Sequence, residues 1–207
     1  MVQLWTKYWP NTQDHRGPII GPNDMDISIH NKVTSPMSTT HASQRQYWIT
    51  ATSGLIAATL DISFAFIFNG IHGVTPARIL TFIASGLVGP VAKTMGVWSV
   101  VLGAVLHYFI CLCAAFVYLF VSRQFPLLVR HPLPCGAGFG VAMYVFMNFV
   151  VIPLSRIPFH FPSTRSMIGE LCSHIFLFGM VIAVGVARAS RVEGGTVQTG
   201  QTASRAL

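Results

Sequence analysis

The chain alternates between long apolar segments and short polar connections. Four apolar segments are long enough to cross a bilayer, which takes about 20 helical residues. They cover residues 47–69, 97–121, 135–154 and 167–187. Segments of this kind are helical in a membrane, because a helix satisfies its own backbone hydrogen bonds where no water is present. The pattern therefore predicts an all-α integral membrane protein with four transmembrane helices.

A fifth apolar segment lies between the first two spans and is too short to cross the membrane. Thr75 is a predicted N-cap, and Pro76 suits the first position of a helix. A helix over residues 77–89 would be about 20 Å long, well below the thickness of the hydrocarbon core. We expect a short interfacial or re-entrant helix here, and the alternative is a loop packed over the bundle.

The two ends of the chain are polar and show no sustained helical period. We expect residues 1–46 and 189–207 to be disordered tails that flank a membrane domain over residues 47–188. An alternative for the first tail is that translation begins at Met25 or Met37. The four spans also form two similar hairpins, in which a Gly- and Ala-rich helix precedes one with a central histidine. This similarity is compatible with an internal duplication.

The composition supports a membrane protein and argues against a nucleic-acid-binding one. Hydrophobic residues make up 52% of the chain and charged residues only 9%, whereas about a quarter of a soluble domain is charged. The formal net charge is +7, but the basic residues are spread over loops and tails without a run. Basic residues in such positions are typical of membrane-flanking segments. We therefore expect the lipid bilayer as a partner and no nucleic acid.

The basic residues beside the spans are divided almost evenly between the two sides of the membrane. The side of both termini carries Arg45, Arg123, Arg130, Arg188 and Arg191. The other side carries Arg78, Lys93, Arg156 and Arg165. Because cytoplasmic loops carry the excess of Lys and Arg, this difference of one predicts that both termini are cytoplasmic.

Ionisable side chains inside the spans are the main candidates for function, because they are costly to bury in a bilayer. Glu170 and His174 lie four residues apart and therefore share one helix face. The other three spans each carry polar groups at overlapping depths, at about 1.5 Å of rise per residue. The predicted polar centre consists of Asp61, His107, Tyr144, Asn148, Glu170 and His174.

Two roles of the polar centre follow from these residue types. In a structural role, Asp61 bonds His107 or Tyr144, Glu170 pairs with His174 or with Arg165, and these bonds fix the helix register. Each interhelical hydrogen bond of this kind contributes only about 0.6 kcal/mol. In a transport role, the carboxylates and histidines form a path for protons or ions, because histidine titrates near neutral pH. Four helices make a thin wall for a transporter, so this role implies a homo-oligomer.

A third role is the binding of a metal or a haem. His107, Glu170 and His174 would form a two-histidine, one-carboxylate set that suits divalent first-row metals. Alternatively, His107 and His174 would ligate one haem from opposite sides. The sequence names no particular cofactor. It contains no nucleophile-elbow, HExxH, phosphate-loop or dinucleotide-binding motif, so we do not expect an enzyme.

Several of these residues also recur in a known group of proteins. The relevant positions are Gly54, His107, Phe125-Pro126, Gly136, Gly140, Pro153, Glu170 and His174. In these positions the chain from Leu106 to Ile182, together with Gly54 in the first span, resembles the YagU-like group of small bacterial inner-membrane proteins. The resemblance implies a location in the bacterial inner membrane and adds no activity.

Overall fold

The computed structural model describes residues 36–157 and 163–191, and every regular element in these ranges is helical. The chain divides into two units, Met1–Thr40 and His41–Leu207, and the long apolar helices described below lie in the second. The elements in order are α2 (Pro36–Gly70), α3 (Pro76–Val88), η1 (Gly89–Thr94), α4 (Val97–Gln124), α5 (Leu127–Arg130), α6 (Pro132–Phe146), η2 (Met147–Val151), α7 (Ile152–Leu154), α8 (Thr164–Ser173) and η3 (His174–Gly179). Helical residues 180–191 complete the last span.

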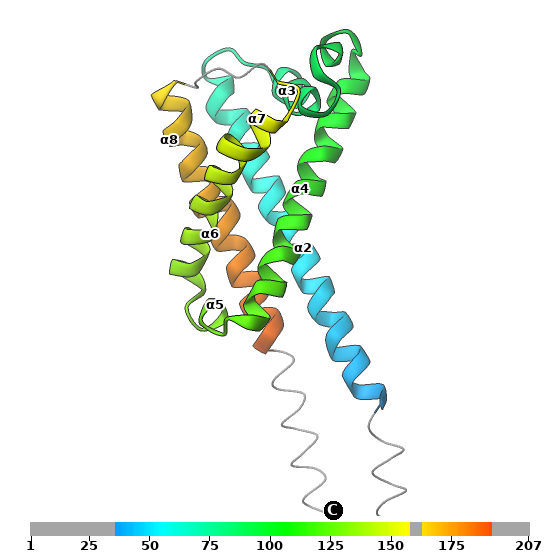
Figure 1. Cartoon of the computed structure of the whole chain (residues 1–207), viewed down its shortest axis with the longest axis vertical. Coiled ribbons are helices and arrows are strands. Elements are labelled where there is room, and N and C mark those ends of the chain that lie inside the picture. Colours follow the sequence, from blue (N-terminus) through cyan, green and yellow to red (C-terminus); the bar gives the residue numbers. More distant parts are fainter. Residues whose placement is uncertain (1–35, 158–162, 192–207) are drawn as a thin grey trace, which may run out of the picture. The chain divides into compact units, whose positions relative to one another are not determined.

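Within the described residues, four helices are long and apolar enough to cross a membrane, and they confirm the predicted all-α membrane fold. They are Ser43–Gly70, Val97–Gln124, Pro132–Leu154 and Thr164–Arg191. Successive spans run in opposite directions, so the second span descends beside the first and the fourth beside the third (Figure 1). The start of the first span and the end of the fourth therefore lie at the same end of the bundle.

Two of the predicted tail boundaries are wrong. The first helix begins at Pro36, so residues 36–46 are helical although we expected them to be disordered. No Gly or Pro interrupts the chain between Met37 and Gly54, and extending an existing helix adds one hydrogen bond per residue. The last helix likewise continues to Arg191. The rest of both predicted tails, and the alternative start at Met25, lie outside the described residues.

The short segment after the first span is helical, as predicted. The Thr75 side chain caps α3 by accepting a hydrogen bond of 3.3 Å from the Arg78 backbone N–H. The helix lies against the first half of α4 (Figure 1), where Thr81 and Ser99 share a hydrogen bond of 2.9 Å. Gly103 allows this approach, because a methyl group in place of its hydrogen would overlap the Leu80 carbonyl.

Glycines bring the third and fourth spans into backbone contact. A methyl group on Gly140 would overlap the His174 carbonyl, and one on Gly179 would overlap the Gly136 carbonyl. Gly136 and Gly140 are four residues apart, which is the spacing by which small residues let membrane helices approach closely. This contact fixes where the Glu170 and His174 face lies against the third span.

Small residues also join the first span to its neighbours. Gly54 lies against Ala115 of α4, and Gly185 of the last helix lies against Ser53. The remaining core is built mainly from alanines and a few large side chains, among them Ala57, Ala58, Tyr118, Leu119, Phe178, Ile182 and Val186. Close backbone packing thus replaces the large apolar core of a soluble bundle.

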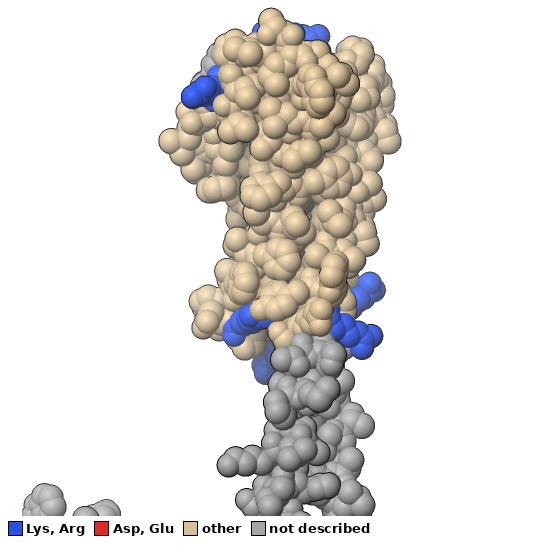
Figure 2. Space-filling view, turned by 90° about the vertical axis from the view of Figure 1, so that its right-hand side faces the viewer, with Lys and Arg blue, Asp and Glu red and all other residues tan. Residues whose placement is uncertain are grey.

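The charged and apolar surfaces of the bundle are segregated. On the face in Figure 2, Lys and Arg side chains gather at two levels, and the surface between them shows neither basic nor acidic residues. Ile67, Phe109 and Phe176 expose 67%, 62% and 58% of their side-chain surface. Large apolar groups exposed on the first, second and fourth spans are what a surface in contact with lipid requires.

The glycine contact predicts a difference between two neighbouring positions on α6. Gly140→Ala should lower the free energy of unfolding by about 1–3 kcal/mol, because the added methyl group meets a backbone carbonyl. Gly138→Ala is the matched control, since nothing lies within 4 Å of its added methyl group. SDS-induced unfolding in mixed micelles, followed by circular dichroism, measures both. Equal stabilities of the two variants would contradict the packing described here.

Candidate functional site

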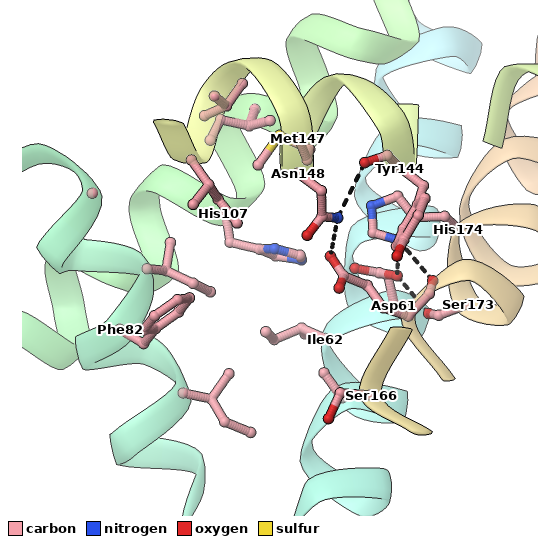
Figure 3. Close-up of a pocket in the computed structure, with 18 of the residues that line it drawn as sticks. Asp61, Ile62, Phe82, His107, Tyr144, Met147, Asn148, Ser166, Ser173 and His174 are labelled. Atoms are coloured by element: carbon pink, nitrogen blue, oxygen red, sulfur yellow. Dashed lines mark hydrogen bonds and ion pairs between the residues drawn. The ribbon is translucent and has the colours of Figure 1, made fainter. Parts of the chain in front are cut away.

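A cavity of about 750 Å³ lies between the four spans and α3, and most of its walls are apolar. All six residues of the predicted polar centre line it. In Figure 3, Asp61, Tyr144, Asn148, Ser173 and His174 gather on one side of the cavity, while Phe82 lies on the opposite side. The structure thus brings the six predicted side chains to one cavity, each from the span to which we assigned it.

Asp61 on α2 is bonded to the fourth span. The Ser173 hydroxyl donates a hydrogen bond of 2.5 Å to Asp61 Oδ1, and His174 Nδ1 lies 3.9 Å from the same oxygen. The predicted bonds from Asp61 to His107 or Tyr144 are not formed. Ser173 was missed as a partner, although it lies three residues after Glu170 and therefore on a neighbouring part of the same helix face.

Glu170 is bonded to the third span. Asn148 Nδ2 donates a hydrogen bond of 3.1 Å to Glu170 Oε1. His174 bonds the backbone rather than the carboxylate of Glu170, because its Nδ1 lies 3.0 Å from the Glu170 carbonyl oxygen. Arg165 is directed elsewhere, with its guanidinium 3.4 Å from His72 and over the ring of Phe68. The predicted pairing of Glu170 with either cation is therefore wrong.

Two π-helical segments carry polar residues of the site. Asn148 lies within η2, and His174 begins η3. Each side chain bonds a carbonyl four residues earlier, Asn148 that of Tyr144 at 3.1 Å and His174 that of Glu170 at 3.0 Å. Pro153 explains η2, because proline has no N–H to continue the α-helical pattern. Such π-helical turns occur frequently at functional sites.

His107 bonds the backbone of the first span rather than either carboxylate. Its Nε2 lies 3.0 Å from the Ala58 carbonyl oxygen, to which it donates when protonated, and Cys111 Sγ lies 3.8 Å from the same nitrogen. The imidazole of His107 also packs edge-on against Tyr108, with ring centroids 5.7 Å apart. His107 therefore lines the cavity as a group joined to α2 rather than as a partner of Asp61.

The predicted metal site does not form. Within residues 36–157 and 163–191, no three side chains of His, Cys, Asp and Glu gather in a group that could hold a metal ion. His107 and His174 bond backbone carbonyls through ring nitrogens, and Glu170 accepts the Asn148 amide. The three residues line one cavity, but their side chains do not gather around one point.

The charge of the cavity comes from very few residues. Asp61 and Glu170 are the only acidic residues between Asp26 and Glu193, and both line the cavity. Each carboxylate has one bonded oxygen, and no hydrogen bond within the described ranges reaches Asp61 Oδ2 or Glu170 Oε2. Arg78 is the only Lys or Arg among the lining residues, and it is exposed on the first turn of α3. With both carboxylates ionised and both histidines neutral, the cavity wall therefore carries one excess negative charge.

Comparison of this chain with family models, with curated proteins and with solved structures gives no match.

The Asp61–Ser173 bond predicts a measurable coupling between the first and fourth spans. In a double-mutant cycle, Ser173→Ala and Asp61→Ala should couple by about 1–2 kcal/mol in the free energy of unfolding, because either change removes the same hydrogen bond. The control cycle pairs Ser173→Ala with Thr59→Val, whose hydroxyl bonds Leu55 and Tyr108 instead. The control changes should add. Additive behaviour of the first pair would contradict the bond.

Proposed function

We propose that this multi-pass membrane protein binds a cation within the bilayer at Asp61 and Glu170 and carries it across. The observation that supports the proposal is that the two acidic residues of the spans line one cavity. In each carboxylate, one oxygen accepts a hydrogen bond and the other accepts none from the described residues. Carboxylates at membrane depth are costly and are usually paired. A cation bound between them would offset this cost.

Protons are the simplest cation that this arrangement can carry. The Ser173 hydroxyl and the His174 imidazole both lie beside Asp61 Oδ1, and His174 lies on the same helix as Glu170. Histidine exchanges protons near neutral pH, and hydroxyl groups both donate and accept hydrogen bonds. These groups therefore offer a path between the two carboxylates without a change in the backbone.

A structural role is the second candidate, and two hydrogen bonds favour it. Ser173 joins the fourth span to the first through Asp61, and Asn148 joins the third to the fourth through Glu170. Both bonds help to set the rotation of the helices. A structural network, however, does not require a cavity. The two roles also predict different effects on transport when Asp61 or Glu170 is replaced by a neutral residue.

Location, relationship and assembly form a further part of the proposal. We place the protein in a bacterial inner membrane with both termini cytoplasmic, as a homo-oligomer without enzymatic activity or nucleic-acid partner. The proposed YagU-like relationship is based on the sequence positions of His107, Glu170 and His174. The five basic residues at the end of both termini, against four at the other end, support the orientation.

Neutralising the carboxylates should abolish cation transport. In liposomes with an imposed potassium diffusion potential and an internal pH indicator, the wild-type protein should pass protons, and Asp61→Asn and Glu170→Gln should each reduce the rate at least tenfold. Thr59→Val, on the same helix as Asp61 but outside the cavity, is the control and should keep the wild-type rate. Equal rates in all four proteins, or no flux at all, would leave the structural role.

The orientation predicts which loops an impermeant reagent reaches. The background is a variant in which alanine replaces Cys111, Cys113, Cys135 and Cys172. Into it, Lys93→Cys and Arg130→Cys each introduce one exposed thiol, at opposite ends of the bundle. In intact cells a membrane-impermeant maleimide should label position 93 and not position 130, and both should label after lysis. The reverse pattern in intact cells would invert the topology.

A further inference from the structure

We infer that, besides protons, the cavity binds a singly charged organic cation with a large apolar body, which enters from the lipid phase. This inference rests on the proposed cation binding at Asp61 and Glu170, and it adds the chemical class of the ligand. Four features of the described residues carry it: the volume of the cavity, its walls, its charge and its rim.

The volume is that of a site for a small molecule. Cavities that bind small molecules measure about 300–1,000 Å³, and this one measures about 750 Å³. A bare metal cation instead needs several oxygens around one point. Here the two carboxylates bond different neighbours, Ser173 and Asn148, and no group of three metal-ligating side chains gathers in the described ranges. A larger ligand would fill the space that an inorganic ion leaves empty.

The walls suit an apolar body that carries a positive charge. Aromatic rings line the cavity from three of the spans and from α3, namely Phe64, Phe68, Phe82, Tyr144, Phe149 and Phe178. Aromatic faces attract cations, and they attract them more strongly where water is excluded. The two carboxylates supply the charge-specific contact. The aliphatic and aromatic walls offer apolar surface that the body of the ligand can contact. A hydrated ion would make no use of this surface.

The charge of the wall fits one positive charge on the ligand. When Asp61 and Glu170 are ionised and His107 and His174 are neutral, the lining residues carry two negative charges and the one positive charge of Arg78, which leaves one negative charge. A ligand with one positive charge would make the occupied cavity neutral. Because Arg78 is exposed on the first turn of α3, its charge opposes the entry of cations.

The rim of the cavity is apolar except for Arg78. Phe82 and Leu87 of α3 and Phe149 of η2 line the cavity and also expose 43%, 56% and 60% of their surface. Side chains of this kind are stable against lipid and unfavourable against water. A ligand that partitions into the membrane would reach the carboxylates past this rim without crossing a polar surface.

The test compares two ions of the same shape and opposite charge, tetraphenylphosphonium and tetraphenylborate. Isothermal titration of the detergent-solubilised full chain, corrected for binding to empty micelles, should show saturable binding of the phosphonium and at least tenfold weaker binding of the borate. Asp61→Asn and Glu170→Gln should each weaken phosphonium binding at least tenfold. Arg78→Gln should strengthen it several-fold, and Lys93→Gln, an exposed cation of η1 outside the cavity, should leave it unchanged.

The outcomes separate this inference from the proposed function. Equal binding of the two ions, or a phosphonium affinity that does not respond to Arg78→Gln, would overturn the inference even if the carboxylate variants failed to fold. Proton flux that depends on Asp61 and Glu170 without saturable phosphonium binding would overturn the inference and leave the proposed function intact. The absence of both flux and binding would overturn both.

Discussion

The backbone contact between the third and fourth spans is the interaction on which the polar centre depends. Gly136 and Gly140 on one helix and Gly179 on the other leave no room for side chains between the two backbones. The contact point at Gly140 is the carbonyl of His174 itself. Because the helices meet there, Asn148, about two turns after Gly140, comes within hydrogen-bonding distance of Glu170, about one turn before His174. The glycines thus set the geometry of a site that they do not line.

The two π-helical turns also affect the positions of the polar side chains, because each changes the rotation of its own span. A π-helical turn takes more residues than an α-helical one and therefore rotates the residues that follow it. In η2 and η3 the side chains of Asn148 and His174 bond carbonyls four residues earlier, so these turns keep their polar groups satisfied. Each of the two spans therefore presents its polar residues at a local irregularity that faces the cavity.

Much of the fold could be predicted from the sequence, because its signals are local. Span length follows from uninterrupted apolar runs, and the start of α3 follows from Thr75 and Pro76. It was also predictable that the six residues of the polar centre face the interior of the bundle, since ionisable groups avoid lipid. The pairing within it was not: Ser173 rather than His107 bonds Asp61, because the rotation of each span depends on glycine contacts and on π-helical turns. A regular helical period, applied to the whole chain, misses both effects.

The proposed binding of a cation requires that Asp61 and Glu170 be accessible from an apolar phase inside the folded bundle. Dicyclohexylcarbodiimide tests it directly, because this hydrophobic reagent modifies carboxyl groups that it reaches through the membrane. Peptide mass spectrometry of the folded protein in vesicles should find adducts on Asp61 and Glu170, and bound tetraphenylphosphonium should suppress them. A folded protein in which neither residue reacts, while both react after denaturation, would show carboxylates sealed within a structural network and would contradict the account.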